Sequence, residues 1–447
     1  MKKSFFLLAL PWFLLFGAAV WVQTSPVASQ INPTSASYLP YIERALPTPT
    51  FTPSPTPSPT PTPTATPSGA MVEMRGLWIT RFDWTVFNQP ASPAKIDEMV
   101  DNAAYAGFNV IFFQVRGTAD AYYTPGLEPW AQRISGGTLG QAPDPYWDPL
   151  QRLIERAHAN GIQVHAYVNV YPLWDCGTTP SAAASPQHLY YKVRDYHGQT
   201  NGHLNGVQWA GQTGTQCSSY LRTSPASIFV DDHLMAVAND LASRYDLDGL
   251  HLDHIRYGGS NASCDPVSMF YWGGSCFGAG YADWQRQQVN GTVRRFYDDV
   301  IAQHPDMLFS AAVWPIHIDK WGWGATQGYH SYYQDSKAWQ AGGYIDAIMP
   351  MIYPSNFDTD TFWTLEKWRT LVQDFMGESS GRWVIPGIGT GYSDFAQIEA
   401  RINSAREFGT AGHALFSYGD LYRLGYFDDL ANGPYAQPAT IPDTPWR

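Results

Sequence analysis

The chain has 447 residues and a formal net charge of −12, and charged and aromatic residues each make up 15% of it. Nucleic-acid binding relies on clustered cations that displace phosphate counterions, so this acidic balance argues against a nucleic-acid partner. The hydrophobic fraction of 44% is enough for a large core and excludes global disorder. We therefore expect a soluble, aromatic-rich globular protein, either an enzyme or a binder of neutral polar ligands.

The N-terminal segment has the layout of an export signal. Lys2 and Lys3 precede an apolar run from Phe5 to Val22, which Pro11 interrupts. Because eighteen residues are just enough to cross a bilayer, an uncleaved membrane anchor is the alternative to a cleaved signal peptide. Both interpretations of residues 1–28 predict export to an extracellular, cell-surface or periplasmic location, and the anchor would tether the protein to a membrane.

A proline- and threonine-rich stretch follows. The segment Pro47–Pro67 contains nine prolines and eight threonines in 21 residues. It lacks apolar surface to bury, and its nine prolines have no amide donor, so we predict a disordered, extended linker over residues 29–70. It would serve as a stalk or as a dispensable spacer. The rest of the chain divides into one domain over residues 71–432 and a tail over residues 433–447.

Four cysteines lie in the predicted domain, and none has C-x-x-C spacing. A zinc cage is therefore poorly supported, and we predict neither a structural metal nor a cofactor. In an exported protein an even number of cysteines indicates disulfides, for which three connectivities are possible. We favour Cys176–Cys217 with Cys264–Cys276, because each pair would close a single loop.

From residue 71 onward, short apolar runs alternate with longer helical patterns, which is typical of repeated β-α units. Eight runs are predicted as strands: Arg75–Thr80, Asn109–Arg116, Gln163–Asn169, Gly249–Tyr257, Leu308–Trp314, Ala347–Tyr353, Trp383–Gly389 and His413–Tyr418. The helices predicted between them cover Pro93–Gly107, Pro149–Asn160, Ser224–Tyr245, Tyr281–His304, Ser331–Trp339, Thr361–Phe375 and Phe395–Phe408. Eight such units predict an α/β fold, a (β/α)8 TIM barrel. Its longest loops, Tyr171–Thr223 and Gly258–Gly280, follow strands three and four.

The C-terminal ends of the strands build the active site of a TIM barrel, and many polar residues fall there. In the densest segment, Asp248–Tyr257, the period-two alternation of a strand places His251 and Asp253 on one face. Burying an unpaired carboxylate is costly, so Asp253 is either paired with Arg116 or Arg256 or used in chemistry. The rim residues that we expect to contact a substrate are Arg116, His165, Asn169, His251, His254, Arg256, Trp314, Tyr353 and Asp420.

Glycoside hydrolysis is the chemistry that this rim fits best. It needs one carboxylic acid to protonate the leaving oxygen and a second carboxylate as base or nucleophile. Asp253 supplies one of these groups. Asp83, Asp120, Asp319 and Asp420 are candidates for the other, and we prefer Asp120 and Asp319, although each also fits a loop-capping role.

Two alternatives remain open. A metal-dependent hydrolase would use His251, Asp253 and a histidine such as His165 as ligands. A barrel that binds glycans without cleaving them would keep the same aromatic rim. Aromatic residues near the strand ends, including Trp321 and Trp323 in a glycine-rich run, favour a sugar ligand in either case, because sugar rings pack their C–H faces on aromatic planes.

Several segments together resemble the glycosyl-hydrolase-like family ten proteins over nearly all of residues 71–432. The segments that carry the resemblance are Arg75–Thr80, Gly107–Arg116, Asp148–His158, Gly161–Asn169, Tyr245–Asp253, Gly387–Gly391 and Ala414–Tyr418. The resemblance implies an exported barrel that acts on glycans, with bacterial cell-wall glycan strands as the leading substrate. We expect such a protein to act as a monomer.

The resemblance also implies residue roles. It places the essential carboxylate at Asp253, with Arg116, His165, Asn169 and His251 in contact with this carboxylate or with the sugar. Family members usually carry a second aspartate directly after the first, where this chain has His254. That difference concerns the mechanism and leaves the predicted fold unchanged.

Overall fold

The computed structural model describes residues 71–198, 220–259, 264–276 and 278–447. The predicted signal or anchor (residues 1–28) and linker (residues 29–70) lie outside these ranges. Strands of one parallel sheet form the centre of the molecule, in the order β10-β9-β8-β7-β4-β3-β2-β12-β11. Their bounds are β2 Met74–Ile79, β3 Val110–Arg116, β4 Gln163–Asn169, β7 Gly249–Asp253, β8 Leu308–Val313, β9 Ala347–Pro350, β10 Trp383–Val384, β11 Gly387–Gly389 and β12 Gly412–Phe416.

The sheet closes into a ring because β10 and β11 are two parts of one strand. They are separated only by Ile385 and Pro386. The amide of Ile385 donates to the Ile348 carbonyl (3.0 Å), and the Pro386 carbonyl accepts from Ala414 (3.1 Å). The strand thus pairs with β9 through one half and with β12 through the other. The predicted eight-stranded parallel barrel is confirmed.

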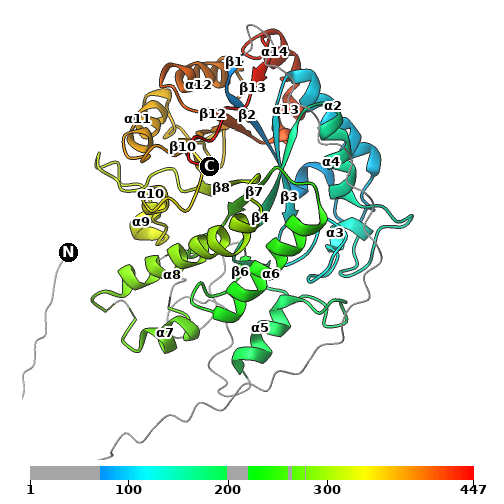
Figure 1. The fold of residues 1–447 in the computed structure, drawn as a ribbon, viewed down its shortest axis with the longest axis vertical. Helices are drawn as coiled ribbons and strands as arrows, with labels where there is room; N and C mark the ends of the chain where they lie inside the picture. Colours follow the sequence, from blue (N-terminus) through cyan, green and yellow to red (C-terminus); the bar gives the residue numbers. More distant parts are fainter. Residues whose placement is uncertain (1–70, 199–219, 260–263, 277) are drawn as a thin grey trace, which may run out of the picture. The chain divides into compact units, whose positions relative to one another are not determined.

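Helices lie around the outside of the ring (Figure 1). Their bounds are α1 Arg81–Trp84, α2 Pro93–Ala106, α3 Gln132–Ser135, α4 Pro149–Ala159, α5 Leu189–Gly198, α6 Ile228–Arg244, α7 Pro266–Trp272, α8 Tyr281–Arg295, α9 Gly328–Ser331, α10 Ser336–Ala341, α11 Leu365–Met376, α12 Ala396–Glu407, α13 Tyr418–Leu424 and α14 Phe427–Asn432. A π turn, η2 Phe296–Val300, and a 3-10 turn, η3 Ile301–Gln303, extend α8. No helix within the described ranges is long and apolar enough to cross a membrane.

Local sequence signals explain most element boundaries. Helix α2 begins after Ser92 with Pro93 in its first turn and ends at Gly107, whose φ of 84° suits a residue without a Cβ atom. Helix α6 begins later than predicted, because the hydroxyl of Ser227, and not that of Ser224, caps the Val230 amide. Helix α10 likewise begins after Asp335, which caps Ala338, and not at the predicted Ser331.

Strands β7 and β9 end three or more residues earlier than predicted. Strand β7 stops at Asp253 because the next residue, His254, has a φ of 52°, which turns the chain out of the sheet. Strand β9 stops at Pro350, where the ring nitrogen has no proton to donate to a neighbouring strand. Both endings lie at the rim where we expected the site.

Apolar side chains fill the barrel and the layer between strands and helices. The alternation of side chains along β7 separates these two regions. Leu250 and Leu252 pack toward the helices, whereas Gly249, His251 and Asp253 lie on the opposite face of the strand, toward the barrel interior. Trp78, Phe112 and Tyr167 are buried in the barrel interior together with Met74, Val110, Leu308, Ala347, Met349, Trp383, Ile385 and Ala414. The barrel is a packed core that supports the rim from below.

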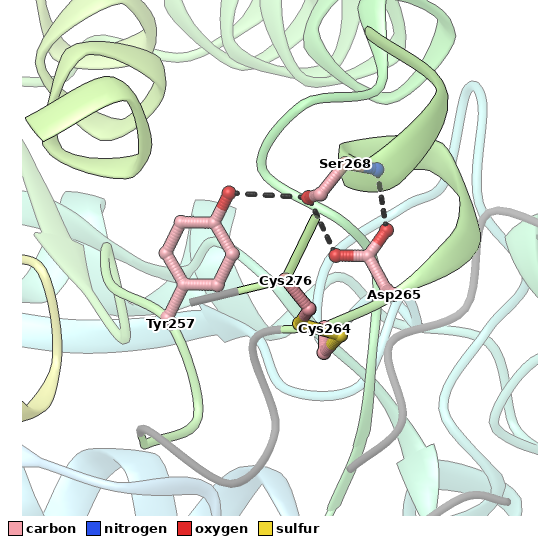
Figure 2. The surroundings of a disulfide bond; sticks show 5 residues. All are labelled: Tyr257, Cys264, Asp265, Ser268 and Cys276. Carbon is pink, nitrogen blue, oxygen red and sulfur yellow. Dashed lines mark hydrogen bonds between the residues drawn. A yellow bond between two sulfur atoms is a disulfide. The ribbon is translucent and has the colours of Figure 1, made fainter. Parts of the chain in front are cut away.

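The two long loops carry secondary structure of their own. An antiparallel pair, β5 Pro172–Asp175 with β6 Tyr220–Arg222, belongs to the loop after β4, and α7 belongs to the loop after β7. The predicted Cys264–Cys276 disulfide is present beside α7, with a Cα–Cα distance of 5.8 Å (Figure 2). Next to it, Asp265 caps α7 and accepts from the Ser268 hydroxyl (2.6 Å). The predicted Cys176–Cys217 pair lies outside the described residues, because Cys217 does.

The predicted tail packs against the barrel domain. Strand β13 Ala439–Thr440 pairs with β1 Met71–Val72. Trp446 contacts Trp383 with ring centroids 5.6 Å apart, and its indole N–H donates to Asp346 (2.8 Å). Arg447 pairs with the same carboxylate. The last residues therefore cover the amino end of the barrel.

Candidate active site

A cleft of about 450 Å³ opens at the carboxyl ends of the strands. Its lining combines polar groups at the ends of the strands with aromatic rings from strands, from a helix and from loops. The lining residues are Trp78, Thr80, Arg81, Phe82, Asp83, Gln114, Tyr167, Asn169, Tyr220, Asp253, His254, Arg256, Ala312, Met351, Tyr353, Phe416 and Ser417. This is the end of the barrel at which TIM-barrel proteins carry their active sites.

Aromatic side chains and a neutral histidine support the cleft from inside the barrel. The imidazole of His251 packs against Phe112 (ring centroids 4.7 Å apart) and Tyr167 (5.5 Å). Its Nε2 accepts from the Trp78 indole N–H (3.1 Å), and its Nδ1 bonds the Ser310 hydroxyl (2.9 Å). Burial lowers the pKa of His251 to about 3, so this imidazole is neutral. His251 thus holds the layer beneath Asp253 and does not line the cleft.

Asp253 faces the cleft from the end of β7. One carboxylate oxygen, Oδ2, accepts from the Tyr167 hydroxyl (2.7 Å). The other, Oδ1, accepts from the His254 amide (2.5 Å) and from Arg256 (3.3 Å). Burial favours the neutral acid, but the charge of Arg256 and the hydrogen bonds from Tyr167 and the His254 amide hold the pKa of Asp253 well below its usual range. Asp253 is therefore an ionised carboxylate.

His254 lies beside Asp253 in a left-handed backbone conformation (φ 52°), which is uncommon for a residue with a side chain. Its Nδ1 faces the guanidinium groups of Arg222 (3.1 Å) and Arg256 (3.4 Å). Its Nε2 is 3.9 Å from Asp253 Oδ2. Burial and the charges of the neighbouring arginines keep the pKa of His254 well below its usual range, although Asp253 opposes this.

Asp83 lines the same cleft from α1, directly after β2. Its Oδ2 accepts from the Thr80 amide (2.6 Å), and its Oδ1 accepts from the Gly419 amide (3.1 Å) and the Ser417 hydroxyl (3.3 Å). Burial outweighs these hydrogen bonds and raises the pKa of Asp83 to about 6. The cleft thus contains two carboxyl groups whose environments shift their pKa values in opposite directions.

Aromatic and cationic side chains form the walls. Arg81 lies over the Phe82 ring (4.2 Å to its centroid) and donates to the Tyr220 hydroxyl (2.9 Å). Tyr353 stacks on Phe416 with ring centroids 5.0 Å apart and an interplanar angle of 4°. Flat apolar faces next to polar groups are the surface to which sugar rings, with their C–H faces and hydroxyls, are complementary.

Arg116 does not reach the cleft. Its guanidinium is fully buried and makes a two-point ion pair with Glu128 (2.8 Å for both bonds). It also donates to the backbone carbonyls of Asn169 and Val170 at the end of β4. Arg116 therefore fixes the backbone that carries Asn169 opposite Asp253 in the strand register. Of the two structural partners considered for Asp253, the one observed is Arg256.

The two aspartates that we preferred as the second carboxylate lie elsewhere. Asp120 is buried beside a separate cavity of about 50 Å³, which shares only Arg81 and Phe82 with the main cleft. Its carboxylate accepts from the Thr118 amide (2.7 Å). Asp319 accepts from the backbone amides of Trp321, Trp323 and Gly324, the loop-capping arrangement considered above.

Three further predicted contact residues also lie away from the cleft lining. His165 is fully buried inside the barrel against Phe112. Trp314 packs on Tyr332 (ring centroids 4.1 Å apart) behind Arg256, and Asp420 pairs with Arg423. The structure brings together the predicted residues Asn169, Asp253, His254, Arg256 and Tyr353.

Tyr167 and Gln114 are the informative omissions from the prediction. Tyr167 precedes Asn169 by two residues on β4, and Gln114 precedes Arg116 by two on β3. Period-two alternation would have found Tyr167 as a residue on the same face as Asn169. Phe416 follows Ala414 by two residues on β12, so the same alternation places it on the interior face, whereas the contribution of Tyr220 depends on how the long loop after β4 folds over the rim.

The metal alternative finds little support in the donor atoms. Both ring nitrogens of His251 are engaged in hydrogen bonds, and His165 lies below it in the barrel. Among the residues that the structure describes, no group of three or more histidine, cysteine, aspartate or glutamate side chains is arranged to hold a metal ion.

The fold and the position of the cleft define a TIM-barrel protein with its site at the carboxyl ends of the strands. A family model described as "Glycosyl hydrolase-like 10" matches residues 73–374, and the chain belongs to this family. The resemblance inferred from the sequence is thereby confirmed.

Named relatives agree with this assignment. The chain is 26% identical to the glycosyl hydrolase YngK of Bacillus subtilis over 400 residues, which cover 84% of this chain and 74% of YngK. It is 26% identical to the glycosyl hydrolase DigH of Escherichia coli K12 over 328 residues, 66% of this chain and 69% of DigH.

Two solved structures share the fold. The PgaB (BpsB) glycoside hydrolase domain from Bordetella bronchiseptica aligns with a TM-score of 0.58 at 13% identity, over 80% of this chain and 98% of that domain. The alpha-L-fucosidase isoenzyme 2 from Paenibacillus thiaminolyticus aligns with a TM-score of 0.51 at 12% identity, over 81% of this chain and 49% of that chain.

Proposed function

We propose that the protein is a glycoside hydrolase that uses two carboxyl groups, Asp253 and Asp83, on opposite sides of a bound glycan. The observation that carries this proposal is the divergence of the two groups in one cleft: Asp253 is held ionised, whereas burial raises the pKa of Asp83 to about 6. Glycoside hydrolysis needs this combination of a carboxylate and a proton-bearing acid.

The roles follow from the charge states. Asp83 supplies the proton to the leaving oxygen, since it retains a proton up to mildly acidic pH. Asp253 supplies negative charge as the base or nucleophile. We assign the second carboxyl group to Asp83 instead of Asp120 or Asp319, because neither of these lines the cleft. Arg256 and Tyr167 keep Asp253 ionised and oriented.

The substrate that we propose is a polysaccharide, with bacterial cell-wall glycan strands as the leading candidate. The aromatic walls support a sugar ligand. The family relationship supports a glycosidic bond as the bond that is cleaved. The signal-like segment at residues 1–28 supports an exported enzyme that meets such glycans outside the cytoplasm, in keeping with the proposed location.

Digestion of purified peptidoglycan, with and without its peptides, tests the proposal. New reducing ends and shortened glycan strands, read by mass spectrometry, are the expected result for the wild-type chain. The Asp253→Asn variant, which keeps the size of the side chain, serves as the control and should produce neither. Absence of cleavage by wild type on cell-wall glycans and on a panel of common polysaccharides would refute the proposed activity.

A glycan-binding protein without hydrolytic activity is the second candidate. The observation that favours it is His254, which occupies the place where the family resemblance leads us to expect a second aspartate. This candidate predicts that wild type and Asp253→Asn bind insoluble glycan equally well in a sedimentation assay and that neither releases reducing ends.

A further inference from the structure

We infer that the Nε2–H of His254 and the carboxylate of Asp253 together hold the water molecule that attacks the sugar, so that hydrolysis inverts the anomeric configuration. This inference rests on the proposed glycoside hydrolase function and assigns Asp253 the role of base instead of nucleophile. It concerns the residue at which this chain departs from the pattern expected of its family.

The neighbours of His254 determine which ring nitrogen carries the proton. Nδ1 faces Arg222 Nη2 at 3.1 Å and Arg256 Nη2 at 3.4 Å. A guanidinium can only donate hydrogen bonds, so Nδ1 must be an acceptor without a proton. A neutral imidazole has one N–H group, which is therefore on Nε2. Two arginines thus fix the tautomer of His254.

Among the described residues, this N–H group makes no hydrogen bond to another protein group. Asp253 Oδ2 lies 3.9 Å from Nε2, which is too long for a direct hydrogen bond. His254 lines the cleft, so an oxygen atom from solvent or substrate can reach this donor. The ring is held from the side by Tyr220, whose ring contacts it edge-on at 5.8 Å between centroids.

The spacing between the donor and the carboxylate oxygen suits a single O–H group. For a water oxygen about 2.8 Å from both His254 Nε2 and Asp253 Oδ2, the angle Nε2···O···Oδ2 is about 90°. This angle is acceptable for a water molecule that accepts one hydrogen bond and donates another. Water would donate a proton to Asp253 Oδ2 and accept from His254 Nε2–H. An aspartate at position 254 could not donate in this way while ionised, because it only accepts.

The step is balanced with the groups present. The water oxygen forms a bond to the anomeric carbon while its O–H bond breaks and the proton passes to Asp253. The bond from the anomeric carbon to the leaving oxygen breaks, and that oxygen takes the proton of Asp83. Because water attacks from the side opposite the leaving group, the product has the inverted configuration.

Other charged groups face His254 from several elements. Arg81 comes from α1, Arg222 from β6, and Arg256 and Asp253 from the end of β7 and the residues after it. Arg222 is not itself part of the cleft lining; it contacts His254, and among the described residues its Nη1 has no hydrogen-bond partner. Burial and repulsion by Arg256 lower the pKa of Arg222 only to about 10, so it remains a cationic donor at neutral pH. Arg222 is therefore a positioning residue that acts through His254.

A matched pair of variants tests the role of His254. Glutamine extends far enough to place an amide N–H near the position of Nε2, whereas asparagine reaches only the position of Nδ1. We expect His254→Asn to lower kcat about 100-fold with KM changed less than threefold, and His254→Gln to retain kcat within about 10-fold. Asparagine tolerates the left-handed conformation better than histidine, so loss of folding does not account for that result.

Two further measurements separate this inference from the proposed function. Proton NMR of the initial product should show the inverted anomer. Nitrogen-15 NMR of the imidazoles should show His254 as the Nε2–H tautomer at pH 7, and Arg222→Met should perturb that signal and lower kcat without raising KM.

The outcomes are distinct. A retained anomer, equal kcat values for the Asn and Gln variants, or a loss confined to KM would overturn the water-holding role and leave the glycosidase proposal intact. A wild-type chain that cleaves none of the glycans would overturn both, and an Nδ1–H tautomer would overturn the inferred donor whatever the activity.

Discussion

The two ends of the barrel each hold a buried aspartate, but only the aspartate at the carboxyl end lines an open cleft. At the amino end, Asp346 accepts from the Phe309 amide (2.7 Å), the Trp446 indole (2.8 Å) and Arg382 (3.3 Å), and it also pairs with Arg447. At the carboxyl end, Asp253 accepts from Tyr167, Arg256 and the His254 amide, yet it lines an open cleft.

The difference shows how the surroundings of an aspartate can suit it to a structural or a chemical role. Asp346 is fully buried and surrounded by donors that come from the strands and from the last two residues of the chain. Its charge joins the tail to the barrel. Asp253 keeps 7% of its surface exposed, and its neighbour His254 offers an unused N–H group beside it. A carboxylate that keeps access to a substrate can act on it, whereas a saturated one stabilises the fold.

Replacing Asp253 should produce the largest effect. Asp253→Asn keeps the volume of the side chain and removes the charge, so kcat should fall about 1000-fold or more, which corresponds to about 4 kcal/mol or more of lost transition-state stabilisation. Reducing-end kinetics measure the loss, and circular dichroism checks that the fold is kept. Near-wild-type turnover in this variant would contradict a catalytic role for Asp253.

The matching change at the other end should act on stability. Asp346→Asn leaves Arg382 and Arg447 without their common counter-ion, and the free energy of unfolding should fall by about 3 kcal/mol. Urea denaturation measures this change, and kcat of the folded protein at low temperature should match wild type. A loss of kcat without a loss of stability would show that Asp346, at the amino end, affects catalysis at the carboxyl end.

Asp83→Asn should give the third effect, a decrease in kcat/KM of about 100-fold. Because burial raises the pKa of Asp83 to about 6, the wild-type acid loses its proton as pH rises through 6, and kcat/KM should fall there. The variant should lack this alkaline limb. A variant with an unchanged pH profile would exclude Asp83 as the proton donor.

The raised pKa of Asp83 also predicts a pH dependence of the free energy of unfolding. Folded Asp83 binds its proton more tightly than the unfolded chain, whose aspartate titrates near 3.8, so this residue makes stability fall as pH rises from about 4 to 6. Thermal melts of wild type should show this contribution over that window, and those of Asp83→Asn should not.

Removing one hydroxyl beside Asp253 should have the smallest effect. Tyr167→Phe deletes a hydrogen bond to the carboxylate and should raise the pKa of Asp253, because a hydrogen bond to a charged group contributes about 1.5–3 kcal/mol. The acidic limb of the kcat/KM profile should move up by about one pH unit or more. The Asp253 contribution to stability, present above pH 4 and lost as pH falls, should shrink with it. Identical acidic limbs in the two proteins would contradict the assigned contact.

Much of the fold followed from local patterns in the sequence. Strand β4 has the predicted bounds, Gln163–Asn169, and Gly161 just before it ends the preceding helical pattern. Helix α2 begins and ends where Ser92, Pro93 and Gly107 predict. Eight such units suffice to predict a barrel, and the barrel places Asp253 at the rim.

The partners of the rim residues could not be predicted in the same way. Arg116 was expected in the site, but the ion pair with Glu128, twelve residues later in a loop, removes it from the cleft. Asp83 was one of four carboxyl candidates, and its selection depends on burial under Ser417 and Gly419, more than 330 residues away. A pKa depends on such distances, which local sequence does not report.

The sequence by itself thus determined the barrel, the strand that ends at Asp253 and the departure at His254, because each depends on the order and spacing of neighbouring residues. Tertiary structure alone decided which carboxyl group shares the cleft, and it decided that Arg222 and Arg256 leave His254 with its proton on Nε2. The physical reason is that hydrogen bonding and desolvation act between atoms that the fold brings within a few ångströms, whatever their separation along the chain.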